Sequence, residues 1–526
     1  MTEANLLWSH VRTVQRRQPL FWTVACTLAH EREPTRTEIV HGQTPTKAVT
    51  AAFIDAERTP PDMVNDLLTV NRLLHRLGWH DIIERGRANS LYSWNPWLDP
   101  TILHQVHCLD EQVRSLIALL HLGQDVPLAD LDTVVVESLE SDGLIARNAT
   151  GDRWTAVWRL TSFRGIAGVA GGGYGRSADD VYLGSDGLRF TDAVLAARPR
   201  GRVLDVGCGS GIASAAAAQT AQAVTAIDVV SDAAEATRLT GELNGVTKTL
   251  SASAVDLDQF PIDPSVDTVI ANLPGLPVPE CISYPVAGNG GPDGRALIRG
   301  FWHKFAASLS EVSARELIMR FESVGDEFIP AALEELRELF GTRCDVLVVT
   351  DAQLPLTVRH SMTAKNATAL NSGLTNDEIL QQLHRGTDDA KNTHFYCATL
   401  KLRYPGEGTF QHIMAALRLD IDNGYRPTAS TARSPERMLR DFLTGFRSIP
   451  DEFYSLGGLD EIDLLWDRFD DVRQALHEGQ TPRKIGTELV AMNGATHESR
   501  VLAVALAVAV AAQTLVDAGD LVCDIP

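Results

Sequence analysis

The chain has 526 residues, 44% of them hydrophobic, and a formal net charge of −21. At roughly 100–200 residues per domain, this length predicts about three domains, each able to bury a core. The negative charge disfavours long nucleic acid as a partner, because a phosphate backbone would be repelled. A modest positive patch comes from five arginines: Arg153, Arg159, Arg164, Arg176 and Arg189.

Cysteine usage and hydropathy indicate the compartment. Seven cysteines are scattered without a Cys-x-x-Cys pair, as is typical of a reducing cytosol. The first apolar residues are interrupted by charged ones, so no secretory leader is expected. The longest apolar run, 501–516, is shorter than the roughly 20 residues that span a bilayer. We expect a cytoplasmic protein without membrane contact, and we interpret 501–516 as a buried helix or a homodimer contact.

The first third of the chain carries helical patterns followed by a hairpin. Residues 1–112 are expected to form a helical region without a chemical motif. Residues 113–164 combine an apolar-periodic helix at Val113–Leu122 with two alternating runs around the turn Asn148–Asp152, which predicts a winged-helix-like module. Acidic residues before that hairpin would repel DNA, so packing or dimerisation is the favoured role. The glycine-rich stretch 165–177 predicts a flexible linker, with a segment that folds over a cofactor as the alternative.

Strands and helices alternate from 178 to 403, which predicts a parallel sheet with helices on both faces. The expected strands are Arg202–Val206, Ala223–Asp228, Ser251–Ala254, Val266–Asn272, Glu316–Phe321, Asp345–Thr350 and His394–Leu402. Residues 351–393 separate the last two strands by far more than a turn requires and contain a helical pattern at Asn376–His384, so we expect an insertion that forms a lid or binds the substrate.

Residues 404–526 predict a helical C-terminal domain. The helical patterns in it are Pro435–Phe446, Leu459–His477, Lys484–Met492 and His497–Ala518.

A glycine motif follows the first expected strand. In Asp205-Val206-Gly207-Cys208-Gly209-Ser210-Gly211, the glycines let the backbone turn tightly and approach a ligand. Asp228 ends the next strand, where a carboxylate can bind both hydroxyls of a ribose. Asp256, followed by Leu257, comes after the third strand and can accept a hydrogen bond from an adenine amino group, with Asp258 as the alternative ligand. These features predict a nucleoside-binding site.

A second motif, Asn272-Leu273-Pro274-Gly275, follows the fourth strand at the edge where α/β sheets bind ligands. Together these features resemble the class I S-adenosylmethionine (SAM)-dependent methyltransferases. Within that class they are similar to the amino-methylating group with an Asn-Pro-Pro-Tyr-type motif, such as the release-factor glutamine methyltransferases. Gly290–Leu297 resembles the Gly-Gly-x-Asp-Gly segment of that group, and Asp180–Asp192 stands where it places a substrate-side segment.

This resemblance covers about 180–402 and implies a seven-stranded Rossmann-like core with SAM as the cofactor. The implied cofactor-binding residues are Asp205, Gly207, Cys208, Gly209, Gly211, Asp228, Val229, Asp256, Leu257 and Asn272. The implied catalytic residues are Asn272, Leu273 and Pro274, because in that group the Asn side chain and the next carbonyl hold the acceptor nitrogen toward the methyl group. Positioning supplies most of the catalysis, since the sulfonium is already a strong electrophile.

Gly275 departs from the family pattern, because it replaces the aromatic residue that stacks on a planar acceptor. We interpret it either as space for a bulkier acceptor, with Tyr284, Phe301 or Trp302 as the replacement surface, or as a turn before two prolines. The substrate-side candidates are Tyr182, Asp186, Gly275, Tyr284, Asp293 and His360.

The favoured function is methyl transfer to a nitrogen of a small molecule or of a peptide or protein, in specialised natural-product metabolism. The alternatives are O-methylation of a carboxylate or hydroxyl, with His303 or His360 as base; base methylation of rRNA or tRNA, disfavoured by charge and by Gly275; and a non-catalytic SAM-binding regulator. His104 and His107 lack a second ligand pair at zinc spacing, so no metal is expected.

Overall fold

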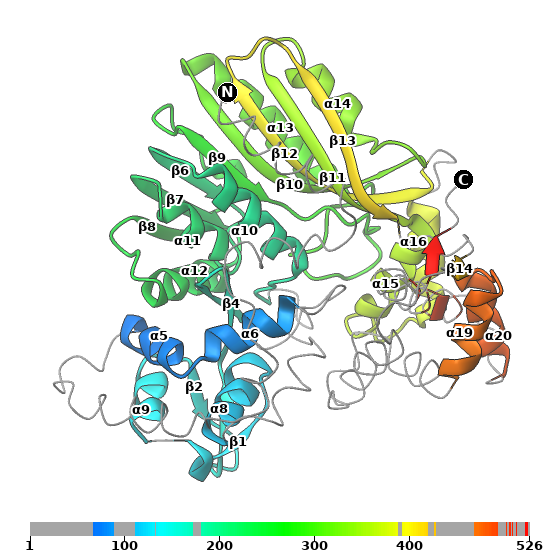
Figure 1. Ribbon diagram of the computed structural model, residues 1–526. Helices are drawn as coiled ribbons and strands as arrows, with labels where there is room; N and C mark the ends of the chain where they lie inside the picture. Colours follow the sequence, from blue (N-terminus) through cyan, green and yellow to red (C-terminus); the bar gives the residue numbers. More distant parts are fainter. Residues whose placement is uncertain are drawn as a thin grey trace. The chain divides into compact units, whose positions relative to one another are not determined.

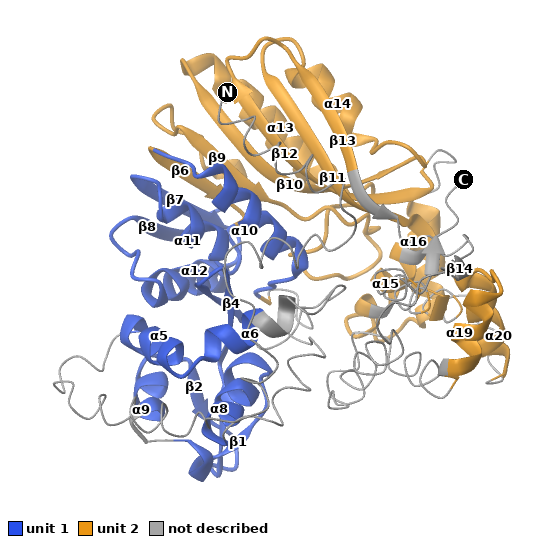
Figure 2. Ribbon diagram, viewed as in Figure 1, with its two compact units in different colours: residues 1–174, 181–200, 208–256 blue, residues 175–180, 201–207, 257–526 orange. Residues whose placement is uncertain are grey.

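The structure is a computed structural model (Figure 1) that describes residues 67–88, 111–131, 133–171, 180–387, 392–418, 425–427, 468–492 and 521–523, together with single positions between 501 and 512. Its contacts divide the chain into two compact units (Figure 2). Unit 1 comprises 1–174, 181–200 and 208–256, and unit 2 comprises 175–180, 201–207 and 257–526. This division cuts through the domain that we predicted at 178–403.

An eight-stranded sheet has the order β13-β11-β12-β10-β9-β6-β7-β8. Its strands are β6 (Arg202–Val206), β7 (Ala223–Asp228), β8 (Leu250–Ala254), β9 (Thr268–Asn272), β10 (Arg315–Gly325), β11 (Asp345–Pro355), β12 (His394–Tyr404) and β13 (Phe410–Arg418). β12 runs antiparallel to both of its neighbours, whereas the other pairings with a recorded register are parallel. This mostly parallel, doubly wound order defines a Rossmann-like α/β fold, and all seven predicted strands are present.

Two features of the sheet differ from the prediction. β10 and β11 run to Gly325 and Pro355, because β12 pairs with both of them as far as His394. The sheet also continues beyond 403, since β13 pairs with β11 where we expected a helical domain to begin. The ring of Phe410 at the start of β13 lies 4.7 Å from the Arg337 guanidinium, a cation–π contact that holds this edge strand.

In unit 2, helices α13 (Ala296–Ser308) and α14 (Ala332–Phe340) pack on one face of β10. Trp302 is fully buried and meets Phe321 of β10 edge-on at 5.6 Å. The predicted insertion is confirmed as helical: α15 (Leu356–Thr368) and α16 (Asn376–Gly386) connect β11 to β12 and contact each other. Unit 2 also contains two short 3₁₀ helices, η4 (Leu257–Gln259) and η5 (Leu309–Glu311).

In unit 1, the helices after residue 180 are α10 (Ser185–Ala197), α11 (Ile212–Ala218) and α12 (Ser231–Leu243). The N-terminal elements are α5 (Leu67–Arg76), α6 (Trp79–Ala88), α8 (Glu111–Leu116), η2 (Ile117–His121), η3 (Leu128–Asp130) and α9 (Thr133–Ser141), with a sheet of β1 (Val126–Pro127), β3 (Arg153–Ala156) and β2 (Ile145–Arg147). The predicted hairpin is therefore confirmed, while a winged-helix identity stays a prediction.

The predicted linker is partly wrong. Residues Ile166–Gly171 form β5, which pairs with β4 (Trp158–Phe163) as a buried hairpin, and only 172–177 of the predicted stretch lie outside the described residues. The small residues allow close packing rather than flexibility: a Cβ on Gly168 would lie 2.9 Å from Ile212 of α11. Asn244 also holds β5, since its side chain both accepts from and donates to the backbone of Ala167.

A buried polar network joins the N-terminal helices to this half of unit 1. The Asn71 amide donates to the Leu243 carbonyl, and Asn71 and Ser162 bind opposite ring nitrogens of His80, each at 2.7 Å. Ser162 in turn donates to Glu84. These contacts explain why the N-terminal elements and the α10–α12 half form one unit.

The described C-terminal elements are α19 (Phe469–His477), α20 (Pro482–Met492) and a small sheet of β14 (Tyr425–Pro427) and β15 (Leu521–Cys523). Two of the predicted helices are thus present in part, the one at 435–446 lies outside the described residues, and the apolar run 501–516 is described only at single positions. No helix in the described part of the chain is long and apolar enough to cross a membrane.

Candidate active site

The glycine motif forms the turn between β6 and α11. Gly207, Gly209 and Gly211 all have positive φ, at 72°, 51° and 74°, which a residue with a side chain rarely adopts. Around Gly209 the backbone is open, because a Cβ there would meet only the Tyr182 carbonyl oxygen, at 3.9 Å. The turn therefore leaves space for a ligand beside Gly209, whereas Gly211 packs against Thr237.

Asp228 lies beside this turn in unit 1. One of its carboxylate oxygens accepts the Gly209 N–H at 2.9 Å, and the other accepts the Val230 N–H at 3.0 Å. Burial raises the pKa of the carboxyl, and these backbone donors oppose the shift. A carboxylate fixed against the open glycine has lone pairs left for the hydroxyls of a ribose, so these residues fit the nucleoside part of SAM.

The other cofactor candidates differ in exposure. Asp205 is buried, with 1% of its surface exposed, whereas Val229 is 61% exposed. Asp256 is exposed after β8, and the Val255 N–H donates to the Asp228 carbonyl. Leu257 begins η4, and its carbonyl accepts from Lys304. Of the predicted set in unit 1, the structure thus brings together Gly209 and Asp228 most directly.

The substrate-side segment reaches the glycine turn through Tyr182. This residue is 44% exposed, and its backbone oxygen is the atom nearest to the open side of Gly209. Asp186 lies in the first turn of α10, and its carboxylate lies close to Gly184 together with the Tyr182 hydroxyl. Of these two substrate-side candidates, Tyr182 thus lies beside the glycine turn through its backbone, and Asp186 lies beside Gly184.

In unit 2 the Asn motif follows β9 directly. Asn272 is the last residue of β9, is half-buried and pairs in register with Arg320 of β10. Leu273 is buried, and its Cδ2 would lie 3.0 Å from a Cβ on Gly207. Asn272 is thus placed at the carboxyl edge of the sheet beside the first glycine of the turn.

Gly275 does not open space, so that interpretation is wrong. A Cβ at Gly275 would lie 2.6 Å from the Cβ of Glu322 on β10. Gly290 and Gly294 pack against the backbone of Gly275. The chain at position 275 lies directly on β10. A side chain at position 275 would collide with that strand.

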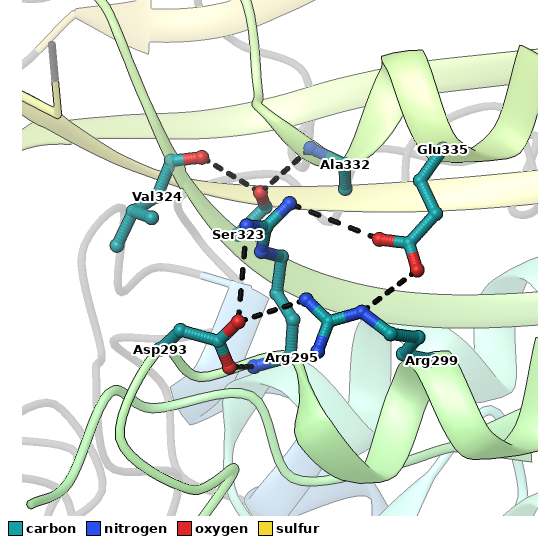
Figure 3. Close-up of polar contacts among 7 residues, drawn as sticks. All are labelled: Asp293, Arg295, Arg299, Ser323, Val324, Ala332 and Glu335. Atoms are coloured by element: carbon teal, nitrogen blue, oxygen red, sulfur yellow. Dashed lines mark hydrogen bonds and ion pairs between the residues drawn. The ribbon is translucent and has the colours of Figure 1, made fainter.

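The loop after Gly275 is closely hydrogen-bonded. Leu276 donates to Gly288 and accepts from Gly290, and Val278 donates to Gly291. Asp293 fixes the end of the loop (Figure 3): it accepts from Arg299 of α13 at 2.8 Å, and Arg299 also binds Glu335 of α14 at 2.9 Å. Burial would raise the pKa of Asp293, but these arginine contacts outweigh burial and lower that pKa. Its contacts are therefore those of a loop anchor, not of a substrate ligand.

Of the three aromatic candidates, two are unavailable to a substrate. Phe301 and Trp302 are both fully buried in the core. Tyr284 is half-buried, and its hydroxyl lies 3.5 Å from the Asn366 amide of α15. Burial raises the pKa of Tyr284, and the smaller effects of Arg359 and Glu322 act on that pKa in opposite directions.

A row of charged side chains near the Asn motif was missed by the sequence analysis. Arg320 and Glu322 alternate along β10, so they point to the same face. Arg320 makes a bidentate pair with Asp351, at 2.7 and 3.0 Å, and the Glu322 carboxylate lies 4.0 Å from Arg359 of α15 and accepts from the Cys397 thiol at 3.9 Å. Charged residues spaced by two within an apolar central strand were the available signal.

His360, a predicted substrate residue, is 1% exposed and packs against His384 of α16, with their Nδ1 atoms 3.2 Å apart. Burial and the neighbouring His384 lower the pKa of His360 to about 3. A buried neutral histidine in a helix pair stabilises the insertion, so its role as a substrate residue is not supported. His104 and His107 lie outside the described residues.

Comparisons with known proteins fit this geometry. The family described as "Ribosomal protein L11 methyltransferase (PrmA)" matches residues 187–290. A ribosomal protein L11 methyltransferase of Dechloromonas aromatica is 31% identical over 137 residues, covering 26% of this chain and 40% of that protein. A ribosomal RNA small subunit methyltransferase C of Citrobacter koseri is 40% identical over 100 residues, covering 19% and 28%. The chain thus spans less than half the length of either relative.

Among solved structures, an rRNA methylase from Streptococcus thermophilus aligns with 41% of this chain and 97% of its own, at 15% identity and a TM-score of 0.24. The fold is defined by the strand order described above and not by this likeness. The sequence matches identify residues 187–290 as part of a SAM-dependent methyltransferase domain, with SAM as its cofactor, as the motifs predicted.

Proposed function

We propose that this protein transfers a methyl group from SAM to a nitrogen of a small molecule or of a peptide or protein. The observation that carries the proposal is the position of Asn272 at the end of β9, next to the buried Leu273 and Gly207. An amide there can accept N–H hydrogen bonds and orient the nitrogen lone pair. SAM supplies the electrophilic methyl group, Asp228 and the glycine turn bind its nucleoside, and Asn272 holds the acceptor.

Nitrogen is favoured over oxygen because O-methylation of a hydroxyl or carboxylate is usually assisted by a base. Of the two histidines considered for that role, His360 is buried against His384, and His303 is exposed on α13. The similarity of the Asn motif to the release-factor glutamine methyltransferases supports a nitrogen acceptor, and membership of that group remains part of the proposal.

A base methyltransferase acting on RNA is the second candidate, because one relative is named for ribosomal RNA. The net charge of −21 and the absence of a side chain at Gly275 weigh against it. We further propose a cytoplasmic enzyme of specialised metabolism, in which the 351–393 insertion recognises the acceptor.

The test uses SAM labelled with tritium in its methyl group and an extract of the source cells, separated into small-molecule, protein and RNA fractions. We expect label in the small-molecule or protein fraction that survives mild base, in which methyl esters release methanol. Mass-spectrometric fragmentation of the labelled product should place the methyl group on nitrogen and not on an ether oxygen. Label confined to RNA would favour the second candidate. Label lost in base would establish O-methylation and contradict the proposal.

A further inference from the structure

The loop after the Asn motif is held at both of its ends. Its base is closed by its own backbone, because Leu276 donates to the Gly288 carbonyl and Val278 donates to the Gly291 carbonyl. Its tip, residues 279–287, contacts the insertion between β11 and β12. Loop and insertion follow β9 and β11, which run in the same direction, so both start at the edge where α/β sheets bind ligands.

A single side chain of the insertion, that of Asn371, bridges to the loop tip. Its amide nitrogen donates to the Ser283 carbonyl at 2.8 Å, and its oxygen accepts the Ser283 N–H at 3.0 Å. The same nitrogen donates to the Ala367 carbonyl of α15 at 2.7 Å. These contacts fix the orientation of the amide, since a flipped amide would set its oxygen against two carbonyl oxygens. Asn371 thus pairs with the loop as a neighbouring strand would.

Two weaker contacts flank this bridge and come from other parts of the insertion. The Asn366 amide of α15 donates to the Tyr284 hydroxyl at 3.5 Å. At the end of α16, a Cβ on Gly386 would lie 2.6 Å from the Cγ of Pro279, so the helix end packs closely on the loop. The tip is therefore held along its length by the insertion, and Asn371 supplies the hydrogen bonds to its backbone.

We propose that Asn371 is a positioning residue that holds the loop tip in the shape required by the methyl acceptor; this inference rests on the function proposed above. Ser283 is exposed, so water can replace Asn371 at its backbone groups, and loss of the bridge frees the tip without unfolding the sheet. The acceptor must then order the tip when it binds. Its apparent dissociation constant rises as the ordered fraction of tips falls, while the rate at saturation is unchanged.

The variant Asn371→Ala tests this role, with Ser372→Ala at the exposed neighbouring position as the matched control. Transfer of label from SAM is measured over a dilution series of the active extract fraction and expressed per SAM-binding site. We expect Asn371→Ala to raise the half-saturating amount of the fraction about 10-fold, with the plateau rate and the SAM affinity within about 2-fold of the wild type. Ser372→Ala should change none of the three quantities.

This split between half-saturation and plateau separates positioning from general stability. A general loss of stability lowers the number of SAM-binding sites and leaves the half-saturating amount where it was. An unchanged half-saturating amount in Asn371→Ala, or an equal rise in Ser372→Ala, would therefore overturn the inference and leave the proposed function intact. Absence of transfer by the wild-type protein to every fraction would instead contradict the proposed function.

Hydrogen exchange gives a second readout that needs neither cofactor nor acceptor. Although Ser283 is exposed, its N–H should exchange slowly in the wild-type protein, because it is donated to Asn371. The segment 279–287 should exchange at least about 10-fold faster in Asn371→Ala and at the wild-type rate in Ser372→Ala. Rapid exchange at Ser283 in the wild type, or equal exchange in the wild type and Asn371→Ala, would show that the bridge does not hold the tip.

Discussion

Two glycine-rich segments lie at the edge of the sheet, and their glycines have different structural roles. In the cofactor turn, Gly207, Gly209 and Gly211 supply positive φ angles, and the space around Gly209 stays open. In the loop that follows Asn272, Gly275 lies against β10, where a Cβ would collide with Glu322. Gly209 leaves room for a ligand. Gly275, packed against Glu322, makes room for the protein's own chain, as does Gly211, packed against Thr237.

The largest expected effect comes from placing an aromatic residue at position 275. Gly275→Tyr should prevent unit 2 from folding, because the ring would have to occupy the position of β10. Gly275→Ala should lower the free energy of unfolding by about 1–3 kcal/mol through overpacking. Thermal and urea unfolding followed by fluorescence measure both effects.

Gly373→Ala is the control for this substitution, since a Cβ there meets nothing within 4 Å. It should leave stability within about 0.5 kcal/mol of the wild type. A stable Gly275→Tyr protein would show that position 275 does open space, and the contrast between the two kinds of glycine would be lost.

The cofactor turn can be broken separately through Asp228→Ala. The loss of a carboxylate that accepts from Gly209 and would bind a ribose should weaken SAM binding by about 10²-fold, at roughly 1.5–3 kcal/mol per charged hydrogen bond. Titration calorimetry measures the dissociation constant. Asp232→Ala, an exposed acid in the first turn of α12, should leave the affinity unchanged. Equal losses in both variants would point to general charge and not to a ribose contact.

Acid should lower the stability of the helix pair α15 and α16. The pKa of His360 in the folded protein is about 3, below its ordinary value of 6.5, so the unfolded state binds a proton first as the pH falls. Stability from this group is therefore complete above about pH 6.5 and is lost toward pH 3, by about 2 kcal/mol between pH 7 and pH 5.

Hydrogen exchange in α15 and α16, corrected for the intrinsic rate, measures this loss. His360→Gln should remove the dependence, and His303→Gln, at an exposed site on α13, should retain it. The same slope in His360→Gln would show that another group is responsible.

The contrast between the two segments also explains how far the sequence could be read. Positive φ is a local requirement, so the spacing of Gly207, Gly209 and Gly211 predicted the turn, and Asp228 followed from the end of the next strand. The collision at Gly275 depends on Glu322, far along the chain, and no local pattern contains it. For the same reason, Phe301 and Trp302 could not be recognised as core residues, nor Asp293 as part of an ion-pair network.

Strand existence was predicted better than strand ends. The seven expected strands are apolar runs bounded by turns, which is a local signal. The extension of β10 and β11 and the addition of β13 depend on pairing with β12 and β11, which lie at a distance in the sequence. The β4–β5 hairpin was interpreted as a linker because its glycines and alanines lack bulk, and their burial against α11 and Asn244 became visible only in three dimensions.

The central claim is that Asn272 positions the acceptor. The resemblance also places Asn272 among the cofactor-binding residues, and the two roles can be measured separately. The direct measurement compares Asn272→Ala with the wild type in two assays, the affinity for SAM by calorimetry and the rate of label transfer to the active extract fraction. We predict an affinity within about 3-fold of the wild type and transfer slowed by about 10²-fold or more, as expected for the loss of a positioning group. Unchanged transfer, or a parallel loss of SAM affinity, would contradict the account.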